Sequence, residues 1–170
     1  MITERSAQHE GPEANREERL SLGCPVLMAA VRTKITSMNW LMKEEPTHYS
    51  FDDLVRDKKT SWTGVKNALA QKHLRGIQKG DRIFFYHTGD EKSVVGIAKA
   101  AGPAYVDPAD KEGKLYAVDV VPVKKLKSPV TLAAVKADKA FASFPLVRMS
   151  RLSVMPVTDD EWERIERMGS

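Results

Sequence analysis

Cysteine is almost missing from this sequence of 170 residues, since Cys24 is the only one. A single thiol forms no intrachain disulfide and cannot supply the several thiolates of a cysteine-based metal site. We therefore expect a reducing compartment, the cytoplasm, with association with the nucleoid as the alternative. The chain also lacks an apolar run near the ~18 residues that a membrane-spanning helix needs, so we expect no membrane role.

Several catalytic motifs are missing as well. The chain has no GxSxG, P-loop, GxGxxG or HExxH segment, and its four histidines have no metal-ligand spacing. We therefore expect no cofactor and no metal, and nucleotide chemistry lacks its phosphate-binding glycines. His73 is interpreted as a solvated residue. His87 ends an apolar strand and is either satisfied there by hydrogen bonds or lines a site.

Positive charge is in modest excess, with a net charge of +4 and a pI near 9.1. Residues 1–37 carry five basic and five acidic side chains, so the excess belongs to the rest of the chain. Residues 56–82, here called the basic segment, contain eight cations and two aspartates. The cations are Arg56, Lys58, Lys59, Lys66, Lys72, Arg75, Lys79 and Arg82. This distribution permits an anionic partner.

The N-terminal part differs in composition from the rest. Residues 20–31 are apolar and follow two arginines, as in a signal peptide, but five glutamates precede them and a glycine and a proline interrupt them. We predict instead that residues 1–37 are a disordered extension or an over-long start assignment, with Met38 as the alternative first residue. Residues 38–170 are then one domain, of an ordinary size.

Hydrophobic patterning from residue 38 onward predicts an α+β fold. Expected strands cover 39–43, 82–87, 93–102, 115–123 and 151–157. Expected helices cover 51–57, 64–75, 131–138 and 159–168, the first and last with capping boxes at Ser50/Asp53 and Thr158/Glu161. Gly96 is expected at a bulge or a close backbone approach. Short strands mixed with short helices favour a small bent sheet that closes toward a barrel, with helices outside.

The three tryptophans have different surroundings. Trp40 lies in an apolar strand and Trp162 at helical spacing from other apolar residues, so both are expected in the core. Trp62 follows a polar stretch and precedes Gly64, which predicts an exposed indole in a loop. A nucleobase would stack on such a ring, for about 1 to 3 kcal/mol per contact. The alternative is that Trp62 is a lid over the core.

Six segments together resemble one known family. They are "NWLMKEEP", "SWTGVKN", "KGDRIFFYHT", "VVGIA", "AYVDP" and "RLSVMPVTDDEW", in this order. They are similar to the motifs of EVE domains and cover residues 38–168. The resemblance implies a PUA-like fold, a bent mixed β-barrel with flanking short helices. It also implies a non-catalytic reader of a modified base, chiefly modified cytosine in DNA, with RNA as the alternative, and we expect a monomer.

The resemblance also carries site residues onto this chain. Matching positions are Lys43, Glu45, Trp62, Gly64, Val65, Asn67, Tyr86, His87, Thr88, Arg151 and Ser153. In this reading Trp62 stacks on an extruded base, and Lys43 and Arg151 hold a phosphate or the base carbonyl. Hydrogen bonds to the base edge come from Asn67, Ser153 and the backbone near Gly64 and Val65.

Departures from the family pattern leave other functions open. Glu44 stands where serine is common, Thr88 keeps a hydroxyl, and residues 66–72 lack the usual aromatic, amide and arginine. Glu44 adds a negative charge that would repel phosphate. The first alternative is a small amidohydrolase of the ASCH type that acts on acylated nucleosides, with Lys43 and Glu44 or Glu45 as its acid and base. The second is a protein-interaction module.

Overall fold

The structure, a computed structural model, describes residues 37–170. Apart from Ser37, the predicted N-terminal extension lies outside the described residues, and so does Cys24. Within the described part, no helix has the length and apolar character needed to cross a bilayer.

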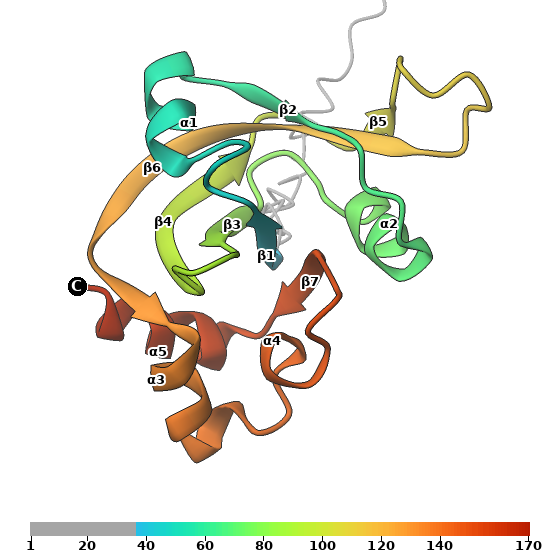
Figure 1. The fold of residues 1–170 in the computed structure, drawn as a ribbon. Coiled ribbons are helices and arrows are strands. Elements are labelled where there is room, and N and C mark those ends of the chain that lie inside the picture. The colour runs from blue at the N-terminus through green and yellow to red at the C-terminus, as the bar shows by residue number, and fades with distance from the viewer. Residues whose placement is uncertain (1–36) are drawn as a thin grey trace, which may run out of the picture. The chain divides into compact units, whose positions relative to one another are not determined.

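The described residues form a mixed sheet with short helices around it (Figure 1). The strands are β1 (Asn39–Glu44), β2 (Thr60–Trp62), β3 (Arg82–His87), β4 (Ser93–Ala100), β5 (Tyr105–Val106), β6 (Tyr116–Thr131) and β7 (Val154–Val157). The helices are α1 (Phe51–Asp57), α2 (Ala68–Arg75), α3 (Leu132–Ala137), α4 (Pro145–Arg148) and α5 (Asp159–Met168), with a 3₁₀ turn η1 (Lys139–Phe141).

The sheet has the order β2-β6-β4-β3-β1-β7, and β5 pairs with β6. Strand β1 runs parallel to β3 and antiparallel to β7, and the other pairs are antiparallel. The long strand β6 curves from β2 and β5 past β4 to α3 (Figure 1). This architecture confirms the predicted bent mixed sheet with flanking short helices.

Local sequence signals placed two helices correctly. The Ser50 hydroxyl accepts from the Asp53 N–H, while the Asp53 carboxylate accepts from the Ser50 N–H, and α1 begins at the next residue. Thr158 and Glu161 make the same reciprocal pair at the start of α5. Each box satisfies backbone donors that the first turn of a helix leaves without partners.

Aromatic rings fill the core where β1 begins. Trp40 and Trp162 are both buried, as predicted. Trp162 stacks on Phe84 with ring centroids 3.7 Å apart. The Trp40 indole Nε1 donates to buried Asp81 at 2.9 Å, and Asp81 also accepts from the backbone N–H groups of Met38 and Gln78. Asp81 therefore joins the turn before β3 to the start of β1.

Gly96 is a position of close approach, as predicted. The pairing register of β4 shifts at this residue. The ring of Phe51, the first residue of α1, lies against the glycine so closely that a Cβ would overlap it. Absence of a side chain is therefore what lets α1 pack on the sheet here.

Long-range pairing changed several predicted boundaries. Helix α2 begins at Ala68 and not at 64, because Gly64 has a left-handed φ of +73° and Asn67 caps the helix. Strand β6 continues to Thr131, since β4 pairs along its second half. The last strand begins at Val154, not at 151. Strands β2 and β5, η1 and α4 were not predicted.

Candidate nucleic-acid interface

The sheet brings several predicted residues together at the end of β1. The Lys43 backbone N–H donates to the Ser153 carbonyl at 2.9 Å, just before β7. On the other side, Lys43 lies opposite Tyr86 in the parallel pair with β3, and the Thr88 N–H donates to the Glu44 carbonyl at 2.8 Å. Three segments far apart in the sequence therefore meet around Lys43.

The Lys43 ammonium is only partly solvated. Its Nζ donates to the Ser150 carbonyl at 3.0 Å and lies 5.7 Å from the centre of the Tyr86 ring. Within residues 37–170 it has no carboxylate partner. Burial lowers the pKa of Lys43 and raises the pKa of the Tyr86 phenol, because it disfavours the charged form of each. An anion at this place would compensate the positive charge that burial removes in part from water.

A cavity of ≈ 200 Å³, here called the lysine cavity, opens beside this ammonium. It is lined by Lys43, Tyr86, Thr88, Gly89, Lys92, Leu132, Lys136, Leu146, Val147 and Ser150. Three of these side chains are cationic and none is acidic. Lys92 and Lys136 were missed by the sequence reading, since they lie in a turn and on a helix that matched no motif.

A second cavity of ≈ 350 Å³, here called the Asn67 hollow, shares Ser150 with the first. It is lined by Asn67, Leu69, Arg148, Met149, Ser150, Arg151 and Leu152. The Asn67 Oδ1 accepts from the Leu69 and Ala70 N–H groups at 3.0 Å each, capping α2. Its exposed Nδ2 has no partner in the described part of the chain and can donate to a ligand.

The loop before α2 is held by a residue that sequence reasoning also missed. Buried Gln71 donates from Nε2 to the carbonyls of Val65 and Tyr116, at 2.7 and 3.3 Å, and accepts from the Tyr116 N–H at 2.9 Å. Gly64 is exposed and has open space where a side chain would stand. A ligand could approach this backbone closely, and its part in base binding remains a prediction.

Trp62 is not the exposed loop residue that we predicted. It belongs to β2, opposite Val118 of β6, and is only 6% exposed. Its ring packs edge-on against Phe85, with centroids 5.3 Å apart. One edge lines a small cavity of ≈ 170 Å³. The other residues around that cavity are Glu44, His48, Tyr49, Thr60, Ser61 and Thr63. A role in base stacking remains a prediction.

His87 has both ring nitrogens occupied by protein groups. Its Nε2 accepts from the Phe51 N–H at 3.0 Å, so the other nitrogen carries the proton and donates to Glu91 at 2.6 Å. Of the two alternatives for His87, the structure therefore shows the strand-end residue that is satisfied by hydrogen bonds. His73 differs from its predicted solvated state: it is half-buried beside Trp40, and burial lowers its pKa.

The predicted acid/base set is not assembled by hydrogen bonds. Glu44 pairs with His48 at 3.0 Å, and Glu45 accepts from the Thr88 hydroxyl at 2.6 Å. Lys43 contacts a backbone carbonyl instead. In residues 37–170, no group of three or more His, Cys, Asp or Glu side chains is placed to hold a metal ion.

Part of the basic segment is engaged elsewhere in the protein. Arg56 pairs with Asp53 and Asp57, and Lys59 pairs with Asp119. Arg82 lies at the start of β3, while the candidate site lies at its end. These three cations are therefore not available to an anion at the candidate site.

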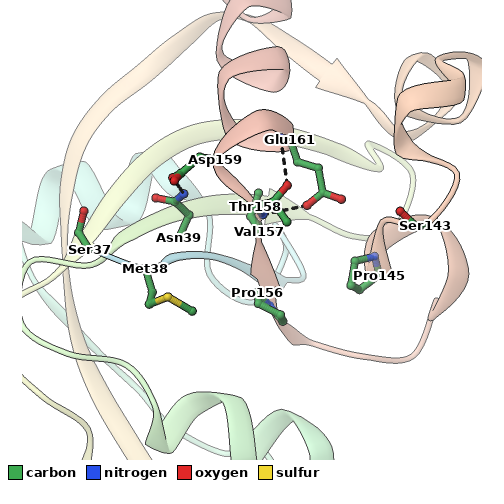
Figure 2. Close-up of a pocket in the computed structure, with 10 residues that line it drawn as sticks. All are labelled: Ser37, Met38, Asn39, Ser143, Pro145, Pro156, Val157, Thr158, Asp159 and Glu161. Carbon is green, nitrogen blue, oxygen red and sulfur yellow. Dashed lines mark hydrogen bonds between the residues drawn. The ribbon is translucent and has the colours of Figure 1, made fainter. Parts of the chain in front are cut away.

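The largest cavity that we describe, ≈ 460 Å³, lies at the opposite end of β1 (Figure 2). It is lined by Ser37, Met38, Asn39, Ser143, Pro145, Pro156, Val157, Thr158, Asp159 and Glu161. None of the predicted site residues is among them. Its two charged groups are carboxylates, and they are engaged with Asn39 and in the α5 cap. This surface is unsuited to an anion.

The chain is similar to proteins of known family. The EVE domain family matches residues 38–168. Human thymocyte nuclear protein 1 is 33% identical over an alignment of 165 positions, which covers 76% of this chain and 73% of the human protein. The NMR structure of a Rhodopseudomonas palustris protein is 46% identical, with a TM-score of 0.75, and covers 78% of this chain and 92% of that one.

Two further structures bear on function and fold. The crystal structure of human thymocyte nuclear protein 1 in complex with 5-methylcytosine-containing DNA is 29% identical, with a TM-score of 0.71, and covers 79% of this chain and 98% of that one. An ASCH structure from Zymomonas mobilis is 16% identical, with a TM-score of 0.51, covering 78% and 96%. That second likeness concerns the fold alone. Together with the human structure, the geometry confirms the predicted PUA-like fold.

Proposed function

The chain belongs to the EVE domain family, and on that premise we propose that it is a non-catalytic module that binds DNA and recognises a modified cytosine. The likeness to human thymocyte nuclear protein 1, whose structure contains 5-methylcytosine DNA, supports this proposal. The match covers nearly all of that structure, so it includes the segments that form the candidate site.

The observation that carries the proposal is the position of the Lys43 ammonium. It is half-buried, is bound only to the Ser150 carbonyl, and lines the lysine cavity next to the Asn67 hollow. Desolvating a cation without an ionic partner is unfavourable, and an anionic ligand removes that penalty. A strand of DNA supplies the anion.

The Asn67 hollow suits the base that accompanies this phosphate. The Asn67 Nδ2 and the Arg151 guanidinium are donors, and Met149 and Leu152 supply apolar surface for a flat ring. An amide and a guanidinium can both donate to the carbonyl of cytosine. Because a base must leave the stack to enter such a hollow, single-stranded or mismatched DNA is expected to bind more tightly than a matched duplex.

Fluorescence anisotropy tests the proposal directly. The full chain is titrated with single-stranded and duplex oligonucleotides that differ only in cytosine or 5-methylcytosine at one position, at several salt concentrations. We expect tighter binding to the methylated strand and a fall in affinity with salt. Equal affinity for both strands would reject modified-base recognition and leave plain DNA binding. The same sequence as RNA forms a third arm.

Two conservative variants assign the base-binding groups. Asn67→Ser keeps a cap acceptor for α2 but removes the amide donor, so we expect weaker binding without a lower melting temperature. Trp62 lines the separate small cavity of ≈ 170 Å³ and not the Asn67 hollow. Trp62→Phe keeps an aromatic ring against Phe85 and tests whether the base lies against the indole instead, in which case methylated and unmethylated ligands should be weakened unequally. Unchanged affinity in Trp62→Phe would show that the base does not contact Trp62.

The alternatives are separated by simple measurements. An acylated-nucleoside panel, followed by chromatography, detects amidohydrolase turnover, which we do not expect because Lys43 and the two glutamates form no hydrogen-bonded set. Pull-downs with and without nuclease distinguish a protein partner from one bridged by nucleic acid.

We propose that the protein is located in the cytoplasm with access to DNA, which fluorescence microscopy of a tagged chain tests. We also propose that it is a monomer, which light scattering tests.

A further inference from the structure

The lysine cavity contains two cations that the family motifs did not identify. Lys92 lies in the turn between β3 and β4, and Lys136 lies on α3, 44 positions further along the sequence. Both side chains are exposed, and neither has an ion-pair partner among the described residues. With Lys43 they give the cavity three positive charges from three separate elements.

The backbone keeps these elements together. The Leu132 N–H, at the start of α3, donates to the Lys92 carbonyl at 2.7 Å. This bond joins the turn to the helix that carries Lys136. Lys92 itself has a positive φ of 40°, which turns the chain sharply just before β4. Like charges repel one another, so holding these three lysines around one cavity is unfavourable in the absence of an anion.

Two carboxylates near the cavity are engaged by protein groups. Glu45 accepts from the Thr88 hydroxyl and lies against Gly89, both of which line the cavity, and Glu91 is bound to His87. Neither lines the cavity. Asp90 is exposed in the same turn as Lys92 and makes no ion pair with another described residue. The balance of charge at the cavity is therefore positive.

We infer that the lysine cavity is a phosphate site, in which Lys92 and Lys136, together with Lys43, hold one phosphate of the DNA strand whose base enters the Asn67 hollow. This inference rests on the proposed function: Ser150 borders both cavities, so a base in the Asn67 hollow would place its neighbouring phosphate beside the lysine cavity. The apolar floor, made by Leu132, Leu146 and Val147, accommodates the adjoining sugar.

Charge-removing variants test this site by the salt dependence of DNA binding. Lys92→Gln/Lys136→Gln is compared with wild type on methylated and unmethylated oligonucleotides. Losing one phosphate contact lowers the slope of log K against log salt by about 0.7 to 0.9, which corresponds to a four- to fivefold loss of affinity at about 0.15 M salt. The loss is expected to be equal for both oligonucleotides, because phosphate contacts carry no base information.

A matched control lies at the other end of the β3–β4 hairpin and in the turn before it. Lys79 and Lys99 are exposed at the other end of the β3–β4 pair, close to Arg82 and away from the cavity. Lys79→Gln/Lys99→Gln removes the same net charge. We expect this variant to change the slope by less than half as much. An equal change in both double variants would show a diffuse charge effect and overturn the site.

A second readout does not depend on DNA. Inorganic phosphate is titrated into the ¹⁵N-labelled full chain, with chloride at matched ionic strength as the reference. We expect saturable shifts of the Gly89 and Lys92 amides that the double variant Lys92→Gln/Lys136→Gln loses. If the wild type binds no DNA but shows these shifts, the proposed function is rejected, and the lysine cavity is a site for free phosphate instead. If DNA binds and neither the slope nor the shifts respond, the site is rejected and the proposed function remains.

Discussion

The cations at the two ends of β1 differ in whether the protein provides them with partners. At the start of the strand, Arg82 donates to Asn39 at 2.8 Å and pairs with Asp159, while its guanidinium lies 4.6 Å from the Trp162 ring. At the other end, Lys43 has only the Ser150 carbonyl. Groups that are matched within the protein stabilise the fold, whereas an unmatched cation remains available for a ligand. The difference indicates which end is built for stability and which for binding.

Removal of the indole at the structural end has the largest expected effect. Trp162→Ala loses the stack on Phe84 and leaves a cavity, so the free energy of unfolding should fall by about 3 to 5 kcal/mol in urea denaturation. Val123→Ala, at a side chain that is 54% exposed, should change it by less than about 0.5 kcal/mol. If Trp162→Ala does not fold, Trp162→Phe should show an intermediate loss. A loss no greater than that of Val123→Ala would contradict the conclusion that this end of β1 stabilises the fold.

Asp81 tests the same end with a smaller change. Asp81→Asn replaces one of the two acceptor oxygens with an NH₂ group, which then faces backbone or indole donors. We expect a loss of about 1 to 3 kcal/mol in unfolding free energy, with the DNA affinity of the folded protein unchanged. Glu163→Gln, at an exposed position of α5, is the control. Weaker DNA binding in Asp81→Asn would show that the two ends of β1 are coupled.

The smallest effect concerns the pH dependence at the binding end. Burial lowers the folded-state pKa of Lys43 below the ordinary value of 10.5. As the pH rises, the folded protein therefore releases this proton at a lower pH than the unfolded chain does. Stability of the wild type relative to Lys43→Met should therefore rise as the pH increases through the interval between the lowered pKa and 10.5, and be constant below it. Because the side chain stays partly exposed, the rise is expected to be slight.

Denaturation curves at pH values from about 8 upward measure this difference, with Lys79→Met as the control at an ordinary exposed lysine. Saturation with oligonucleotide should abolish the rise, because a phosphate beside the ammonium favours its charged form. A pH-independent difference between wild type and Lys43→Met would show that burial does not act on this group.

Local chemistry made part of the fold predictable. The capping boxes at Ser50 and Thr158 specify helix starts through residues three positions apart, and apolar β-branched or aromatic runs specify β1 and β3. Trp62 was misread because its neighbours in sequence are polar, while its strand partner Val118 is 56 positions away. Burial of that ring is decided by pairing with β6, which no local pattern reveals.

The candidate site was predictable to a similar extent. Family motifs placed Lys43, Asn67 and Arg151, and the structure brings them to two cavities that share Ser150. Lys92 and Lys136 had no such signal, because a lysine in a turn and one on a short helix resemble any solvated charge. The pairing of β4 with the end of β6, extended by the bond from the Leu132 N–H to the Lys92 carbonyl, brings them to one place.

The anchoring of the loop before α2 has a consequence for ligands of different size. Gln71 is bonded to the Val65 carbonyl and to both backbone groups of Tyr116, so displacing the Asn67 side of the hollow would strain three hydrogen bonds at once. The segment 148–152 on the other side of the hollow is tied to β1 through the exposed Lys43–Ser150 bond. Adaptation to a bulkier substituent is therefore expected on one side, where the turn at 148–152 moves while the start of α2 keeps its place.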